Sequence, residues 1–232
     1  MTKTPESTAP YLLGLETSGQ TCAVGISQGD QLLLEISAHI RHIHSTHLAP
    51  FVQQAMETAG IALEQLSAIV VSAGPGSFTG LRIGYSLAKG MAHAGDLPLV
   101  EVPTLDVWAF QIGTQPQPIY PLIDAHRGEV FTARYRHQSQ FERETDYQLL
   151  TLDDFCEFLR QQPGILTGRD VPKLADRLLP GLSALPVRVV NTPPHPTLWA
   201  LLTLGYRKFQ SGEFAALETA EPMYMRAFKG IL

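Results

Sequence analysis

The chain has 232 residues, of which 44% are hydrophobic and 17% are charged, and its formal net charge at neutral pH is −5. A chain of this length can bury a sizeable core, either as one large domain or as two lobes of about 100 residues each. The acidic balance excludes a protein that grips RNA by itself through a basic block, and no apolar run reaches the roughly 18 residues of a membrane span.

The first ten residues are polar and include threonine and proline, so we expect a disordered leader rather than a targeting segment. The two cysteines, Cys22 and Cys156, lie far apart and lack the spacing of metal ligands. We therefore expect reduced, buried thiols in a cytoplasmic protein.

An antiparallel meander of three strands is the first structure predicted, over residues 11–15, 22–27 and 31–37. A helix is predicted over residues 46–59, because apolar residues recur there at helical spacing. Gly60 follows where such a helix should stop.

Four histidines cluster between the third strand and this helix, namely His39, His42, His44 and His47. Their spacing fits no metal site on one helix face, and no carboxylate adjoins them. We expect His44 to order the entry to the helix and the others to be solvated. A metal-binding role is the alternative at this point.

A strand over residues 68–72 then leads through a glycine-rich loop into a helix over residues 80–94, and a short strand follows over residues 99–102. Such a loop can hold an anion on unpaired N–H groups at the helix start, for which Thr79 is the expected N-cap. The spacing is that of neither a dinucleotide motif nor a P-loop, and a tight turn without ligand is the alternative. The candidate anion-binding residues of the loop are Gly74, Gly76, Ser77 and Thr79.

The helix over residues 80–94 has two adjacent apolar faces. The bulky face carries Ile83, Leu87 and Met91, and we assign it to the sheet. The small-residue face would admit another helix closely, so we assign it to a partner protein, with packing against the preceding helix of the same chain as the alternative. On this assignment a charge introduced at Ala88 would abolish partner binding and spare the fold. The predicted partner-binding residues are Phe51, Ala55, Gly80, Gly84, Ala88 and Ala92.

The second half of the chain repeats this order of elements more weakly. The repeat consists of a hairpin over residues 119–124 and 129–135, a third strand over 148–150, a helix over 152–161 and a strand and glycine over 164–169. Glu16 and Asp124 then occupy equivalent places at the ends of two first strands. Two carboxylates across a cleft could bind Mg²⁺, although capping of the two hairpin turns is the alternative and no phosphate-binding lysine motif accompanies them.

Four segments, in the same order along the chain, resemble the TsaB (YeaZ) family, the smaller and degenerate relatives of the TsaD/Kae1 proteins that modify tRNA. They are Gly74 to Gly84 (GPGSFTGLRIG), His44 to Pro50 (HSTHLAP), Ile123 to Phe131 (IDAHRGEVF) and Ala220 to Arg226 (AEPMYMR). The resemblance extends from about Leu12 to Arg226.

The resemblance implies an α/β protein with mixed sheets and the two-lobed ASKHA fold, which is actin/Hsp70/sugar kinase-like and ribonuclease H-like. It implies an N-terminal lobe over residues 11–106 that carries the partner-binding helices. It also implies a C-terminal lobe over residues 107–232 whose last residues pack back on the first lobe.

The resemblance further implies a non-catalytic subunit, without cofactor or metal. In such a complex a TsaD-type enzyme transfers threonylcarbamoyl from threonylcarbamoyl-adenylate to N6 of the adenosine next to the anticodon, in tRNAs reading codons that begin with A. The implied partners are the TsaD-type subunit, a TsaE-type ATPase and a second copy of the chain, with tRNA reached only through the complex. In this family both helices of the first lobe join a helical bundle with the partner.

Two departures bear on these expectations. Glu16 stands where the relatives usually have Asp, and the chain lacks the H-x-x-x-H metal pair of TsaD proteins. Two alternatives stay open on the sequence: an ATP-dependent kinase or hydrolase that uses Glu16, Asp124 and the glycine loop, and a metallopeptidase built on the histidine cluster.

Overall fold

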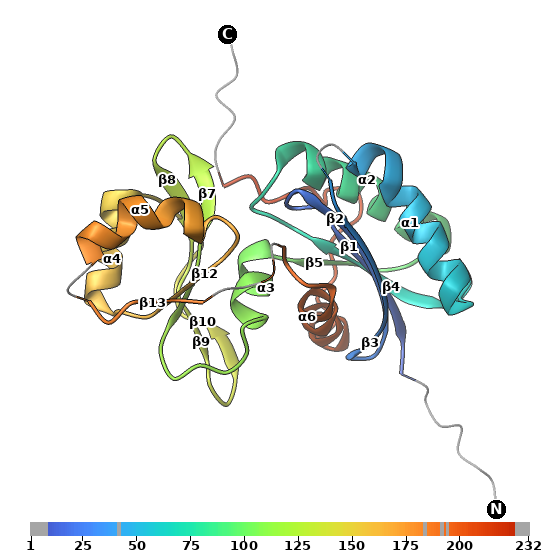
Figure 1. The fold of residues 1–232 in the computed structure, drawn as a ribbon. Coiled ribbons are helices and arrows are strands. Elements are labelled where there is room, and N and C mark those ends of the chain that lie inside the picture. Colours follow the sequence, from blue (N-terminus) through green and yellow to red (C-terminus); the bar gives the residue numbers. More distant parts are fainter. Residues whose placement is uncertain (1–8, 41–42, 183–184, 191–192, 194, 226–232) are drawn as a thin grey trace, which may run out of the picture.

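The computed structural model describes residues 9–40, 43–182, 185–190, 193 and 195–225. Two lobes lie side by side (Figure 1). The helices α3 (Thr104–Phe110) and α6 (Leu198–Ser211) lie between the sheets of the two lobes. The leader predicted over residues 1–10 lies, but for its last two residues, outside the described part.

The first lobe is built on a five-stranded sheet of order β3-β2-β1-β4-β5. Its strands are β1 (Tyr11–Glu16), β2 (Thr21–Gln28), β3 (Gln31–His39), β4 (Leu66–Ser72) and β5 (Leu99–Val102). The first three strands form the predicted antiparallel meander, whereas β4 and β5 run parallel to β1. The sheet is therefore mixed, as the fold class requires.

Helices cover both faces of this sheet. On one face α1 (His44–Ala59) and α2 (Phe78–Gly95) pack on alternate residues such as Leu13, and on the other face α6 packs on residues such as Leu12 (Figure 1). The paired glycines Gly14 and Gly25 let α6 lie close to the sheet, because a Cβ at either would come within about 3 Å of a leucine of α6. Helix α1 ends at Gly60, as predicted, with a left-handed φ of +66°.

The two apolar faces of α2 point the opposite way from the prediction. The small residues face inward: Gly80 and Gly84 lie against Thr17 in the β1–β2 turn, and Ala88 and Ala92 are buried in the core under the sheet. Ala55 of α1 is also fully buried there. The assignment of these five residues to a partner surface is wrong, because they are covered by the chain itself.

The second lobe contains two smaller sheets, of order β10-β9-β6-β12-β13 and β11-β8-β7. Its elements are β6 (Ile119–Pro121), β7 (Ile123–His126), β8 (Glu129–Thr132), β9 (Tyr135–His137), β10 (Phe141–Arg143), β11 (Gln148–Thr151), α4 (Leu152–Gln161), β12 (Ile165–Thr167), α5 (Val171–Leu182) and β13 (Arg188–Val189). The helix over 152–161 and the strands near 148 and 165 are confirmed. Each strand of the predicted second hairpin is instead split in two, because it passes from one sheet to the other.

Helix α3 lies at the expected boundary between residues 106 and 107 and belongs to both cores. Val107 and Phe110 pack with α6 against the first sheet, while Leu105 and Trp108 pack with the second lobe. Asp106 also joins α3 to the second lobe through hydrogen bonds, since its Oδ1 accepts from Tyr135 (2.7 Å) and Tyr147 (2.8 Å). Burial raises the pKa of this carboxyl despite both hydrogen bonds.

Residues 213–225, which we call the C-terminal segment, return along the first lobe beside α2. Ala215 bridges to Leu99, and the amide of Met223 donates to the carbonyl of Ala73 at 2.8 Å. The Tyr224 hydroxyl accepts a hydrogen bond from Arg82 Nε at 2.9 Å. Arg226 of the same motif lies outside the described residues.

The predicted α/β class with mixed sheets is confirmed. Cys22 and Cys156 are free and buried, as expected, and burial raises the pKa of the Cys22 thiol to about 11. Within the described residues, none of the helices has the length and apolar character that crossing a membrane would demand.

Candidate functional site: a closed cleft and an open groove

The first candidate site is the turn that follows β1. Glu16 ends the strand with no exposed surface, and its carboxylate accepts hydrogen bonds from the amide (2.7 Å) and hydroxyl (2.5 Å) of Ser18 and from the hydroxyl of Ser72. Burial raises the pKa of Glu16, although these hydrogen bonds and the nearby His195 work in the opposite direction. Glu16 therefore acts as the cap of its own turn.

The glycine loop packs onto this same turn. The amide of Ser77 donates to the carbonyl of Ser18 at 2.7 Å, and Gly76 approaches that carbonyl so closely that a Cβ would overlap it. The amide of Gly74, whose φ is +99°, donates to Thr104 Oγ1 at 3.1 Å. The amides of Ser77 and Gly74 are thus already bonded within the chain.

The start of α2 also differs from the prediction. Its N-cap is Ser77 rather than Thr79, since Ser77 Oγ accepts the amide hydrogen of Gly80 at 3.2 Å. Thr79 is exposed on the first turn of the helix and faces the neighbouring α1. Its expected part in an anion site at the helix start stays a prediction.

Asp124 occupies the equivalent place in the second lobe but makes different contacts. It pairs with Lys173 of α5 and accepts the amide hydrogen of His126 at 2.8 Å. Its partial burial would raise its pKa, but the Lys173 ammonium and the His126 amide outweigh that effect and lower it. Asp124 is thus an ionised carboxylate held by its own lobe.

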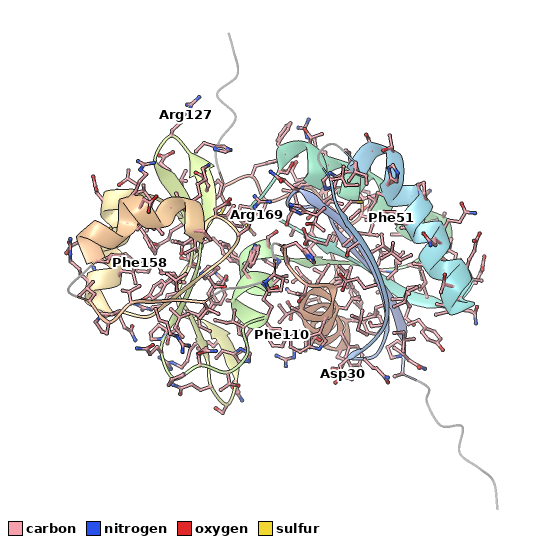
Figure 2. All side chains as sticks on the ribbon, viewed as in Figure 1. Asp30, Phe51, Phe110, Arg127, Phe158 and Arg169 are labelled. Atoms are coloured by element: carbon pink, nitrogen blue, oxygen red, sulfur yellow. The ribbon has the colours of Figure 1, made fainter. Side chains whose placement is uncertain are left out.

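A small cavity of about 10 Å³ lies between the lobes. Its walls come from both lobes and include Ser18, Thr104, Ile123 and Asp170. Arg169 reaches across from the second lobe, where Figure 2 shows it between the lobes, and a Cβ at Gly19 would lie 2.7 Å from its Nη1. A cavity of this size holds about one water molecule.

These residues do not fit a nucleotide or a bound Mg²⁺ in the cleft. Glu16 is enclosed and fully committed to Ser18 and Ser72, and the Arg169 guanidinium fills the space beside the first turn. Mg²⁺ needs several oxygen ligands and usually keeps waters, for which a cavity of one water leaves no room. The kinase or hydrolase alternative has no support from this geometry.

The raised pKa of Glu16 predicts a pH effect on stability. The native state binds the carboxyl proton more tightly than the unfolded chain, so this group's contribution to stability falls as pH rises from about 4.5 through the folded-state pKa. Glu16→Gln resembles the protonated carboxyl and cannot ionise, so the stability of this variant does not fall with pH through this group. We expect the free energy of unfolding of the variant, relative to the wild type, to increase from pH 4 toward neutrality in urea denaturation. A constant or decreasing difference would contradict the assignment.

Two of the four clustered histidines, His39 and His44, contact the same residue, Thr21. His44 is buried and its Nε2 lies 3.1 Å from the carbonyl of Thr21, so it orders the entry to α1 as predicted. His39 and His47 are exposed, as expected. The Nδ1 of His39 also lies 2.9 Å from Thr21 Oγ1, and the ring of His47 lies against Phe51. His42 lies outside the described residues. Among those described, no three His, Cys, Asp or Glu side chains are placed to share a metal ion.

The second candidate site is an open groove of about 670 Å³ between α1 and α2, which we call the α1–α2 groove. Its floor is apolar and includes Leu48, Ile83 and Leu87. These bulky residues of α2 are the ones predicted for the core, and they are only partly buried. The rim is polar and includes Ser45, Thr79, Arg82 and Ser86.

Arg82 borders one end of the groove and is held there by aromatic rings. Its guanidinium lies 3.9 Å from the centre of the Phe78 ring, and the Tyr224 ring lies 5.5 Å from that of Phe78. Phe78 and Tyr224 are both among the exposed large hydrophobic residues. The C-terminal segment therefore contributes to the edge of the groove.

Sequence reasoning missed the residues that close the cleft. Ser18 follows Glu16 by two positions, which is the spacing of a side chain that bonds its own turn. Arg169 follows Gly168 at the end of a strand, but nothing local indicates that its side chain spans the lobes. Phe51, in contrast, was predicted to bind a partner and lies half-buried on α1 (Figure 2), where that role stays a prediction.

Comparison with known proteins finds consistent relatives. The family model for TsaD, tRNA N6-adenosine threonylcarbamoyltransferase, matches residues 38–165. The chain is 32% identical to the tRNA threonylcarbamoyladenosine biosynthesis protein TsaB of Bacillus subtilis, over 68% of this chain and 71% of that protein. It is 28% identical to the TsaB protein of Escherichia coli, over 93% and 94%. A solved structure, YeaZ from Pseudomonas aeruginosa, superposes with a TM-score of 0.79 at 25% identity, over 93% of this chain and all of that one.

Proposed function

Because the chain belongs to the TsaB family and carries the TsaD-type domain over residues 38–165, we propose that it acts in the synthesis of threonylcarbamoyladenosine in tRNA, as a non-catalytic partner of a TsaD-type enzyme. That enzyme transfers threonylcarbamoyl from threonylcarbamoyl-adenylate to N6 of the adenosine next to the anticodon. The present chain supports the transferase and takes no part in the chemical step.

The observation that carries this proposal is the α1–α2 groove. It is an open, apolar-floored channel between two helices of one lobe, with a polar rim. A helix from another protein fits such a channel, because an amphipathic helix buries its apolar face in a groove and leaves its polar face outside. Ile83 and Leu87 then serve as the contact surface in place of the small residues of α2.

The closed cleft supports the non-catalytic part of the proposal. A nucleotide between the lobes would need more room than the cavity of about 10 Å³ beside Arg169 and the Glu16 turn. The amides of Gly74 and Ser77 are bonded to the chain itself. The loop thus joins α2 firmly to the first turn and fixes the position of the groove.

The same groove suits a second copy of the chain, so a homodimer and the complex with the transferase would compete for one surface. We further propose that a TsaE-type ATPase joins the assembly, and that tRNA binds through the complex rather than to this chain alone. With a net charge of −5, the isolated chain is expected to bind RNA only non-specifically. The proposed location is the cytoplasm.

A charge placed in the groove should separate binding from folding. Ala49 is exposed on α1 and lines the groove, so Ala49→Glu inserts a carboxylate into the contact without entering the core. Near a helix N-terminus that charge does not destabilise α1. Burying it unpaired costs more than 1.4 kcal/mol, so binding to the TsaD-type subunit of the same organism should weaken by about tenfold or more. Isothermal titration calorimetry measures the effect.

Gln54→Glu is the matched control, because it adds the same charge at an exposed position of α1 outside the groove lining. Both variants should melt at the wild-type temperature. Equal binding by wild type and Ala49→Glu would place the partner elsewhere on the chain and remove the support that the groove gives to the proposal.

A further inference from the structure

The turn between β7 and β8 contains a run of left-handed backbone. His126, Arg127 and Gly128 have φ angles of +62°, +57° and +82°. Arg127 and Gly128 form a two-residue hairpin loop, since His126 pairs with Glu129. Such a loop favours Asn-Gly, and the Cβ of an arginine disfavours the left-handed conformation. Backbone preference therefore does not account for an arginine at this position.

Two further cations lie beside this turn. Arg177 of α5 reaches it, because a Cβ at Gly128 would lie 3.3 Å from the Arg177 Nη2. Lys173 is exposed one helical turn earlier on the same face of α5. Like charges four residues apart repel, so helix stability does not account for this pair. We refer to Arg127, Lys173 and Arg177 as the tip cations.

The carboxylates near the tip cations are of two kinds. Asp153 and Asp154 are exposed at the start of α4, where the amide of Leu152 donates to the carbonyl of Gly128 at 3.0 Å, and others lie beneath the cations. The side chains of Asp124 and Asp170 are only 10% and 15% exposed, and they pair with Lys173 and Arg169 respectively. Glu129 is half-buried, and the exposed Asp176 points about 100° away from Arg177 around the helix. Arg127 instead projects outward from the hairpin (Figure 2). The exposed charges around the turn are therefore of both signs, and Arg127 is a cation of the turn that is open to solvent.

We propose that the tip cations contact the phosphate backbone of the tRNA when the chain is assembled with its TsaD-type partner, an inference that rests on the proposed function. The arginine fork matches the geometry of phosphate oxygens, and contacts of this kind fix position without reading sequence. The cations sit on a tight turn and a helix, so their positions are set before RNA binds. They add to the grip of the partner subunit rather than replace it.

The test uses single substitutions that remove one cation each and keep the fold. Arg127→Asn creates the Asn-Gly loop that this turn favours, so the hairpin is retained. Arg177→Gln removes the neighbouring cation. Arg160→Gln on α4 is the control, because it removes an arginine of the same lobe whose pairing with Glu157 is at the surface. All three variants change the net charge equally.

The measurement is the binding of tRNA to the assembled two-subunit complex at a series of salt concentrations. For Arg127→Asn and Arg177→Gln we expect weaker binding to every tRNA tested. The slope of log K against log salt should fall by about 0.7–0.9 in each, the value for one lost phosphate contact. Arg160→Gln should leave both quantities unchanged.

The outcomes separate this inference from the proposed function. Normal assembly with unchanged salt slopes overturns the inference and leaves the proposed function standing. Loss of assembly in Arg127→Asn also overturns it, because the tip would then bind protein. Failure of the wild-type chain to assemble with the transferase contradicts the proposed function, and the inference falls with it.

Discussion

Ala88→Glu is expected to unfold the protein or to lower its free energy of unfolding by about 3–5 kcal/mol, the typical cost of an uncompensated buried charge. Ala88 has no exposed surface and packs in the core that joins α1 and α2 to the first sheet. Domains are stable by about 5–15 kcal/mol in total, so such a loss is severe. Circular dichroism during heating should show a melting temperature lowered by about 2–4 °C for each kcal/mol lost from the free energy of unfolding.

Gly90→Glu is the control for this substitution. It adds the same charge two residues further along α2, where the backbone is exposed and no atom lies within 4 Å of a new Cβ. This variant should melt at or above the wild-type temperature, since glycine is a poor helix former. If Ala88→Glu instead folded normally and failed only to bind a partner, the inward orientation of the small-residue face would be contradicted.

Gly80→Ala should destabilise the protein although it adds one methyl group. The new Cβ would overlap the carbonyl oxygen of Thr17, which belongs to the backbone and cannot rotate away. Either α2 or the β1–β2 turn must move, and that turn carries the hydrogen bonds of Glu16. Overpacking of this kind typically costs about 1–3 kcal/mol. Urea denaturation of the variant measures the loss.

The same substitution at Gly90 should have the opposite sign. Gly90→Ala meets open space and gains about 1 kcal/mol in helix propensity. Two glycines of one helix therefore respond oppositely to one added carbon. A similar response at both positions would mean that α2 does not press on the first turn as closely as described.

The helix periods and the antiparallel meander of the first lobe could be predicted from the sequence because they depend on local patterns. The meander, the stop at Gly60 and the helix over 152–161 all follow from the spacing of apolar residues and from turn residues. The two apolar faces of α2 were also visible. The pattern did not show which of them meets the sheet, because that depends on how closely Thr17 approaches from another element.

Other features depend on contacts between distant segments and left no local signal. The two strands of the second hairpin change sheets at Leu122 and at residues 133–134, and no local pattern marks either change. Arg169 closes the cleft only because the lobes come together around it. The candidate anion site stays a prediction, but the sequence shows only which amides exist and not that the chain itself occupies those of Gly74 and Ser77.

The position of α6 determines when the first lobe can fold during synthesis. All five strands of its sheet leave the ribosome long before α6, yet α6 covers the face that carries Leu12, Val70 and Val100. Until then this apolar face meets solvent or a chaperone, because nascent chains with uncovered sheets are prone to association. Although the lobes look separate, the first cannot be completed before the second has been made. Contacts between such distant segments also slow folding. We therefore expect the second lobe, which lies between the five strands and α6 in the chain, to complete its fold before the first lobe does.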